Sequence, residues 1–289
     1  MALTFGYLSY EFLGSRGIIL PTWASLLLGQ LITFLLPCIF IAVKSPGCLR
    51  ELFPLRPIGI RNVLMIVGMM LAIQPAAMLL AFATSVFFGN QIGEVVESVA
   101  AEGNLLLTIS IIAIIPAIFE EAALRGIVLS GYRNVKIGFA ALINGLFFGV
   151  MHFSMQQFLY AFVLGAIFCF LVYYTKSLYA AILSHFVINS TQAALSFAFI
   201  GTAPAFEQAF VQQGQDGYSG LLGMIIFPIV ALVFLAVFVW IYVYFKQYNL
   251  KLHGENESIH PQKMLTPYFW GTIGVYIAVM LWISWGTQL

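Results

Sequence analysis

The sequence predicts an all-α membrane protein, a polytopic bundle of about eight transmembrane helices. Of its 289 residues, 62% are hydrophobic and only 8% are charged, too few charges to cover a soluble protein of this size. Apolar runs recur along the chain at the length that a helix needs to cross a bilayer, about 20 residues. The loops between the runs alternate between basic and acidic, as expected when successive helices cross in opposite directions.

Eight apolar runs are predicted to be transmembrane helices. In chain order they cover residues 17–43, 62–89, 104–124, 137–154, 157–175, 177–200, 219–245 and 267–286. Pro75 lies within the second run and is expected to kink it. Pro116 lies one turn before a pair of carboxylates in the third run and is expected to free a backbone carbonyl there. No soluble domain and no internal repeat interrupts the runs, so residues 1–289 are expected to form a single membrane domain.

The charge of the loops predicts how the chain crosses the membrane. Basic residues mark alternate loops: Lys44, Arg50, Arg56 and Arg61, then Arg133 and Lys136, then Lys176, and finally Lys246, Lys251 and Lys263. The intervening loops carry Glu94, Glu97 and Glu102, and later Glu207 and Asp216. Because basic loops stay in the cytoplasm, both termini are expected outside, in a multi-pass protein of the cell membrane. A net charge of +1 without a basic patch argues against a nucleic-acid partner.

Three ionisable residues lie within the third apolar run, at Glu120, Glu121 and Arg125. Charges at bilayer depth are costly unless they are paired or hydrated, so such residues indicate a functional site. Glu121 and Arg125 are four residues apart, share a helix face and can neutralise each other. Glu120 points away from Arg125, and it must therefore face another helix or water. This makes Glu120 the candidate for a reactive carboxylate.

Two later apolar runs carry further candidates for residues of the functional site. His152 lies four residues after Phe148, which is expected to pack beside it, and His185 lies four residues before Asn189 on one helix face. The remaining histidines, His253 and His260, lie in a polar loop and are expected to be solvated. All the motif residues fall within 104–200, which is expected to form the catalytic core.

These side chains suit the hydrolysis of an amide bond in a water-filled intramembrane cavity. Glu120 and His152 together can take a proton from water and so make a nucleophile. The ring of His185 and the amide of Asn189 can donate hydrogen bonds to the oxyanion of the tetrahedral intermediate.

The residues above form three motifs, in this order within the membrane-spanning runs: Glu-Glu-x-x-x-Arg at 120–125, Phe-x-x-x-His at 148–152 and His-x-x-x-Asn at 185–189. Together they resemble the motifs of the CPBP family, the CAAX prenyl endopeptidases and bacteriocin-processing enzymes. These are intramembrane glutamate-type proteases. The resemblance implies that Glu120 and His152 activate water, that His185 and Asn189 bind the oxyanion, and that Glu121 and Arg125 support the site. The short interval between His152 and His185 is more similar to the bacterial branch of the family.

The leading hypothesis is therefore an endopeptidase that acts on a membrane-associated peptide or protein, with or without a lipid, and contacts the bilayer. One alternative is a proton-coupled transporter, which would use the same buried groups as a proton relay. Another is a non-catalytic membrane partner, such as a bacteriocin immunity or scaffold protein, in which the polar cluster only locks helix packing. No cofactor is expected. Zinc is the second possibility, although the chain has no His-Glu-x-x-His motif. No feature of the sequence indicates an oligomeric state.

Overall fold

The computed structural model describes residues 16–17, 20–88, 91–198 and 218–254, and six residues between 270 and 278. All the regular structure in these ranges is helical. The α-helices are α2 Thr22–Gln30, α3 Leu36–Lys44, α4 Leu49–Leu52, α5 Ile60–Phe88, α6 Gln91–Glu102, α7 Leu105–Ile109, α8 Ile115–Glu121, α9 Leu129–Gly131, α10 Ile137–Met151, α11 Met155–Thr175, α12 Leu178–Ala198 and α14 Tyr218–His253. The predicted all-α class is confirmed.

Three π-helical segments join some of these helices into longer rods. They are Leu31–Leu35 between α2 and α3, Ser110–Ile114 between α7 and α8, and Ala122–Val128 between α8 and α9. A π-helical turn widens the helix locally and is frequent at functional sites. The chain is consequently helical without a break from Thr22 to Lys44 and from Leu105 to Gly131.

Five helical stretches of the described chain are long and apolar enough to cross a membrane. They are Thr22–Lys44, Ile60–Ser85, Leu105–Gly131, Met155–Thr175 and Ile225–His253. The predicted count of eight was higher for three reasons. Helix α10 is apolar but has only 15 residues, the second half of α12 is rich in polar side chains, and most of the run 267–286 lies outside the described residues.

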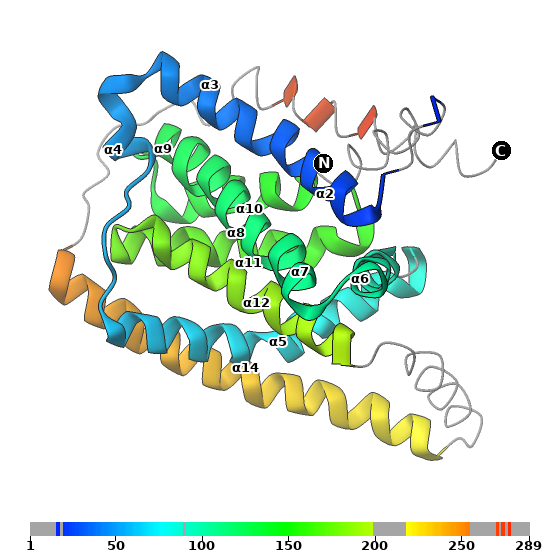
Figure 1. Ribbon diagram of the computed structural model, residues 1–289. Helices are drawn as coiled ribbons and strands as arrows, with labels where there is room; N and C mark the ends of the chain where they lie inside the picture. Colours follow the sequence, from blue (N-terminus) through cyan, green and yellow to red (C-terminus); the bar gives the residue numbers. More distant parts are fainter. Residues whose placement is uncertain are drawn as a thin grey trace.

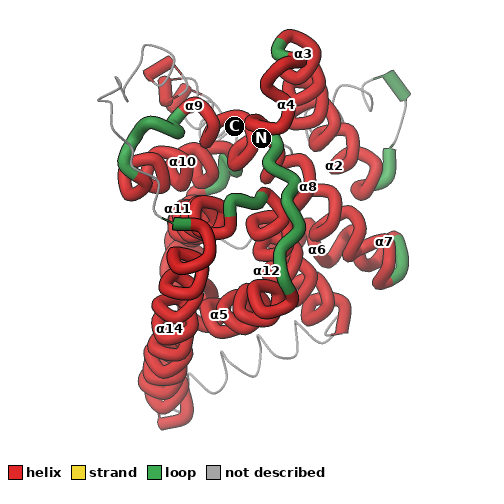
Figure 2. Tube along the Cα trace, turned by 90° about the vertical axis from the view of Figure 1, so that its left-hand side faces the viewer, coloured by secondary structure: helices red, strands yellow, loops and turns green. Residues whose placement is uncertain are grey.

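The helices that carry the predicted motifs lie in the middle of the bundle. Figures 1 and 2 show α8, α11 and α12 between the α2–α3 rod on one side and the paired helices α5 and α14 on the other. Two asparagines join α5 to α14: Asn62 Nδ2 donates to Asn249 Oδ1 at 3.0 Å, and Asn249 Nδ2 donates to Asn62 Oδ1 at 2.8 Å. Buried amides that bond each other fix the register of two apolar helices.

Glycines allow α10 and α11 to cross at very short range. A Cβ atom added to Gly145 would lie 2.6 Å from the carbonyl oxygen of Phe162, and one added to Gly149 would lie 2.8 Å from that of Phe158. On the facing helix, a Cβ on Gly165 would lie 2.9 Å from Phe148 Cβ. Small residues at such a crossing let the backbones of membrane helices approach closely. The hairpin that leads through His152 is thereby held rigidly.

Basic loops meet at one end of the bundle. Arg133 forms an ion pair with Glu51, the backbone N–H of Leu178 donates to the carbonyl of Pro54 at 2.9 Å, and Ser177 Oγ donates to the carbonyl of Arg56. The first, second and third basic loops of the sequence therefore lie on the same side of the molecule, as their charge predicts.

Residues 91–102, expected to be part of an acidic loop, form helix α6. Val96, Val99 and Ala100 are buried on one face, while Glu97 and Glu102 are exposed. Glu102 also holds the start of α2, because its carboxylate accepts hydrogen bonds from Thr22 N at 3.0 Å, Thr22 Oγ1 at 2.7 Å and Trp23 N at 3.3 Å. A carboxylate at a helix N-terminus satisfies otherwise unbonded N–H groups.

Candidate active site

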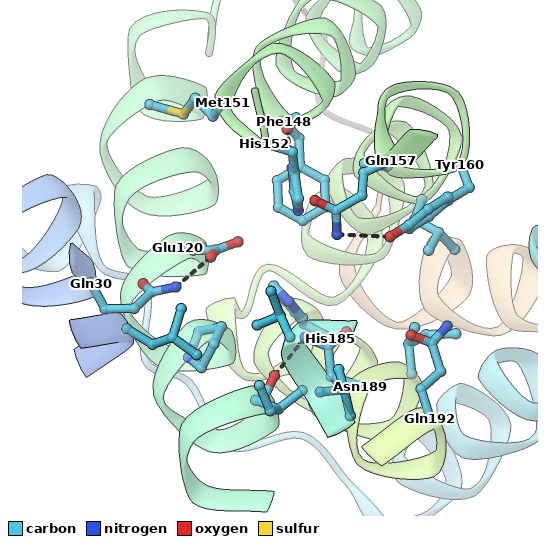
Figure 3. Close-up of a pocket in the computed structure, with 18 of the residues that line it drawn as sticks. Gln30, Glu120, Phe148, Met151, His152, Gln157, Tyr160, His185, Asn189 and Gln192 are labelled. Atoms are coloured by element: carbon cyan, nitrogen blue, oxygen red, sulfur yellow. Dashed lines mark hydrogen bonds between the residues drawn. The ribbon is translucent and has the colours of Figure 1, made fainter. Parts of the chain in front are cut away.

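A single pocket collects the polar side chains that the sequence placed in separate spans. Its volume is about 1080 Å³, including space open to solvent, and its walls come from α2, α6, α8, the end of α10, α11 and α12. Of the predicted site residues, five line it: Glu120, Phe148, His152, His185 and Asn189. Figure 3 shows Glu120 facing His152 and His185 across this pocket.

Glu120 is held by a residue that sequence reasoning did not single out. Its Oε1 accepts a hydrogen bond of 2.7 Å from Gln30 Nε2, at the end of α2. Both side chains are buried, and the second carboxylate oxygen of Glu120 points toward the interior of the pocket (Figure 3). As expected, Glu120 faces away from Arg125 and toward another helix.

Glu121 is the centre of a fully buried charge network. Its Oε1 accepts a hydrogen bond of 2.8 Å from Arg125 Nη1, the predicted pair one turn apart, and another of 2.8 Å from His185 Nδ1. Arg125 Nη2 also donates to the carbonyl of Gly165 at 2.9 Å. Since the carboxylate only accepts, the proton of the His185 ring lies on Nδ1. Glu121 therefore orients His185 and leaves its Nε2 for other partners.

Aromatic rings enclose this network. The guanidinium carbon of Arg125 lies 4.5 Å from the ring centre of Phe148 and 5.2 Å from that of Phe168. The Phe148 ring is edge-on to both histidines, with centroid distances of 4.8 Å to His152 and 5.5 Å to His185. Phe148 thus packs beside His152, as the sequence predicts, and it also separates Arg125 from the pocket space.

His152 follows the last residue of α10, where the chain turns into α11. Its Nδ1 lies 2.6 Å from the carbonyl oxygen of Phe148. A carbonyl cannot donate, so Nδ1 carries the proton and Nε2 of the neutral ring has a free lone pair. The next residue, Phe153, has a left-handed φ of 48°, and Ser154 then caps α11 by accepting from Gln157 N. This tight turn aims the His152 ring into the pocket (Figure 3).

Asn189 is fixed by the backbone carbonyl that Pro116 leaves unpaired. Residue 116 has no N–H to offer the carbonyl of Ile112 four residues earlier, and Asn189 Nδ2 donates to that oxygen at 2.9 Å instead. The expectation that Pro116 frees a carbonyl near the site is confirmed. One N–H of the Asn189 amide remains available to the pocket, because the group has two.

Four further polar side chains line the pocket and were missed from sequence: Gln30, Gln157, Tyr160 and Gln192. Gln157 Nε2 donates to Tyr160 Oη at 2.9 Å on the wall formed by α11. A glutamine inside an apolar run is itself a signal, since polar groups at membrane depth need partners. Of the histidines expected to be solvated, His253 is exposed at the end of α14, and His260 lies outside the described residues.

Within the described ranges, no group of three or more His, Cys, Asp and Glu side chains is close enough to hold a metal ion. Glu121, the only carboxylate bonded to a pocket histidine there, already has Arg125 as its counter-charge. Glu121 is therefore not a free ligand for zinc, which binds three or four such groups.

Part of the chain is similar to a known protein family. Residues 102–191 match the family described as Type II CAAX prenyl endopeptidase Rce1-like. The matched segment holds every motif residue named above, so the part of the chain that forms the site is similar to this family of peptidases. Neither a curated protein nor a solved structure matches the chain. The family match supports a peptidase activity, and it gives no support to a role in bacteriocin immunity.

Proposed function

We propose that the protein is an intramembrane glutamic endopeptidase of the cell membrane, crossing it several times. It hydrolyses a peptide bond in a membrane-associated or lipidated peptide or protein. The observation that carries this proposal is the convergence on one pocket of four side chains from α8, the turn after α10, and α12: Glu120, His152, His185 and Asn189. Apolar side chains line the same pocket, among them Leu26, Phe34, Val95 and Val96, which suits an apolar or lipid-bearing substrate.

In the proposed reaction, Glu120 and His152 Nε2 accept hydrogen bonds from one water molecule and take its proton as its oxygen attacks the scissile carbonyl carbon. The carbonyl oxygen becomes an oxyanion, for which the free N–H of Asn189 is a donor. The proton then passes to the amide nitrogen as the C–N bond breaks. Water is consumed, and a carboxylate and a protonated amine are released.

The hydrogen bond between His185 and Glu121 limits what His185 can do in this reaction. With Nδ1 donating to Glu121, the neutral ring has a lone pair at Nε2 and cannot donate there. His185 therefore assists the oxyanion in its doubly protonated form, for which Glu121 supplies a counter-charge. In the neutral form it acts instead as a hydrogen-bond acceptor for substrate or water.

The test is cleavage by the protein purified in detergent, followed by mass spectrometry. Prenylated and unprenylated peptides are incubated with the wild type and with Glu120→Gln, which keeps the size of the side chain but removes its basicity. We expect wild-type cleavage that is lost in the variant and that persists when a metal chelator is added. Cleavage by Glu120→Gln at the wild-type rate would disprove the assignment, and loss of activity to the chelator, restored by zinc, would replace it with a metalloenzyme.

A further inference from the structure

Glu120 has one hydrogen-bond partner within the described chain, and that partner comes from outside the segment that matches the family. Gln30 lies 90 residues earlier in the sequence, on the α2–α3 rod, whereas the match begins at residue 102. The pocket is therefore completed by an N-terminal helix that the family motifs do not include. Figure 3 shows the Gln30 amide reaching the carboxylate from the side opposite Tyr160.

We propose that Gln30 is a positioning residue, whose amide N–H holds the Glu120 carboxylate in the orientation that activates water. This inference rests on the proposed function. The bond of 2.7 Å to Oε1 fixes the carboxylate plane and leaves Oε2 directed toward the pocket. A hydrogen bond to an ionised group is stronger than one between neutral groups, so it can hold a side chain in one rotamer. Catalytic groups need such support, because a small displacement of a base costs rate.

The other end of the same amide indicates that Gln30 is present for Glu120 rather than for helix packing. Gln30 Oε1 is buried and accepts no hydrogen bond from any residue that the structure describes. An acceptor buried in this way is destabilising, and it calls for an explanation. The amides of Asn62 and Asn249, which join α5 to α14, bond each other through both ends, whereas the only described bond of the Gln30 amide is the one to Glu120.

Two carboxylates hold α2 in place along its length. Glu102 caps its first turn through Thr22 and Trp23, and Glu120 binds its last residue, Gln30. A π-helical segment, Leu31–Leu35, begins directly after Gln30 and shifts the helix face at the point where the side chain must reach α8. The position of Gln30 is thus fixed by backbone structure on both sides of it.

The decisive variant is Gln30→Met, which keeps the length and volume of the side chain but has no donor. We expect kcat for peptide cleavage to fall about tenfold while KM changes by less than about twofold, since a positioning residue acts on the chemical step. Gln30→Asn, whose amide is one methylene too short to reach Glu120, should show the same loss and serves if the first variant does not fold. Ser25→Ala is the control on the same helix, because Ser25 Oγ is buried without a described partner.

A second measurement tests the contact without relying on cleavage. In a double-mutant cycle of Gln30→Met and Glu120→Leu, monitored by thermal unfolding in detergent, the combined effect should differ from the sum of the single effects. Wild-type kcat in both Gln30 variants, additive unfolding effects, or an equal loss of kcat in Ser25→Ala would each overturn the inference. Absence of any wild-type cleavage would instead refute the proposed function, and the unfolding cycle would still report on the pair.

Discussion

Arg125 is the largest fully buried side chain in the described structure, and it is the cation on which the site depends. It neutralises Glu121, donates to the carbonyl of Gly165 and lies between the rings of Phe148 and Phe168. Each of these contacts comes from a different part of the motif region. Arg125 therefore links α8 to α11 and indirectly sets the orientation of His185.

Replacing this arginine should destabilise the fold and not only lower the rate. Arg125→Ala leaves Glu121 as a buried charge without a counter-charge, which costs about 3–5 kcal/mol. We expect a large fall in folded yield and in the unfolding temperature measured in detergent. Arg133→Ala is the matched control, because the Arg133–Glu51 pair is more than half exposed on both sides and such pairs contribute little. Equal unfolding temperatures for the two variants would contradict this reading of the network.

The Asn189 amide has a structural contact with the carbonyl of Ile112 and a proposed catalytic role. Asn189→Leu has a similar volume, but it leaves the carbonyl of Ile112 without its donor, at a cost of about 1–3 kcal/mol. It also removes the proposed oxyanion donor, which lowers kcat about 10²–10³-fold. Ser190→Ala, at the next position of α12, is the control, since Ser190 Oγ bonds only within its own helix. A folded Asn189→Leu enzyme with kcat near wild type would remove Asn189 from the mechanism.

The α10–α11 crossing is the element that most strictly limits substitution. Gly145→Ala places a methyl group 2.6 Å from a backbone oxygen of α11, and because backbone cannot move aside cheaply, we expect a loss of about 1–3 kcal/mol. Gly138→Ala, on the same helix, meets nothing within 4 Å and should be neutral or slightly stabilising. Unfolding temperatures of the two variants in detergent test this contrast directly. A stable Gly145→Ala protein would mean that the helices can separate without loss.

Apolar runs predicted most helices well because membrane helices bond their own backbone and need only a long apolar stretch. The run 62–89 corresponds to Ile60–Phe88, and 157–175 corresponds to Met155–Thr175. Helix α6 was missed, since it has three glutamates in twelve residues and resembles a loop in a search for long apolar runs. The π-helical segments were also not predicted, because no pattern of apolar residues distinguishes them from the neighbouring α-helices.

The candidate site was predictable where its parts lie one helical turn apart. The pairing of Glu121 with Arg125 and the packing of Phe148 beside His152 follow from spacing alone. The bond between Glu121 and His185 and the one between Gln30 and Glu120 join residues 64 and 90 positions apart. Such contacts depend on which helices become neighbours, and spacing in one sequence does not determine that.

In the whole molecule the basic loops meet at one end of the bundle, and the membrane side on which this end lies can be tested with the protein's own cysteines. Cys48 is exposed between the basic residues Lys44 and Arg50, whereas Cys38 and Cys169 are buried. The basic loops meet at one end of the bundle, which the positive-inside rule assigns to the cytoplasm. A membrane-impermeant maleimide should therefore label Cys48 only after the cells are permeabilised.

A cysteine on the opposite side provides the matched measurement. Glu97 is exposed on α6, between two stretches that are long and apolar enough to cross a membrane, and it belongs to the acidic set expected outside. In a Cys48→Ser background, Glu97→Cys should react with the same reagent in intact cells. Labelling of Cys48 in intact cells, with protection of residue 97, would invert the topology and place the basic end of the bundle outside. Equal labelling of both positions in intact cells would mean that residues 48 and 97 lie on the same side of the bilayer. An even number of crossings between them would allow this, whereas an odd number would not. One stretch that is long and apolar enough to cross a membrane, Ile60–Ser85, lies between these two positions in the described chain, so we expect opposite labelling.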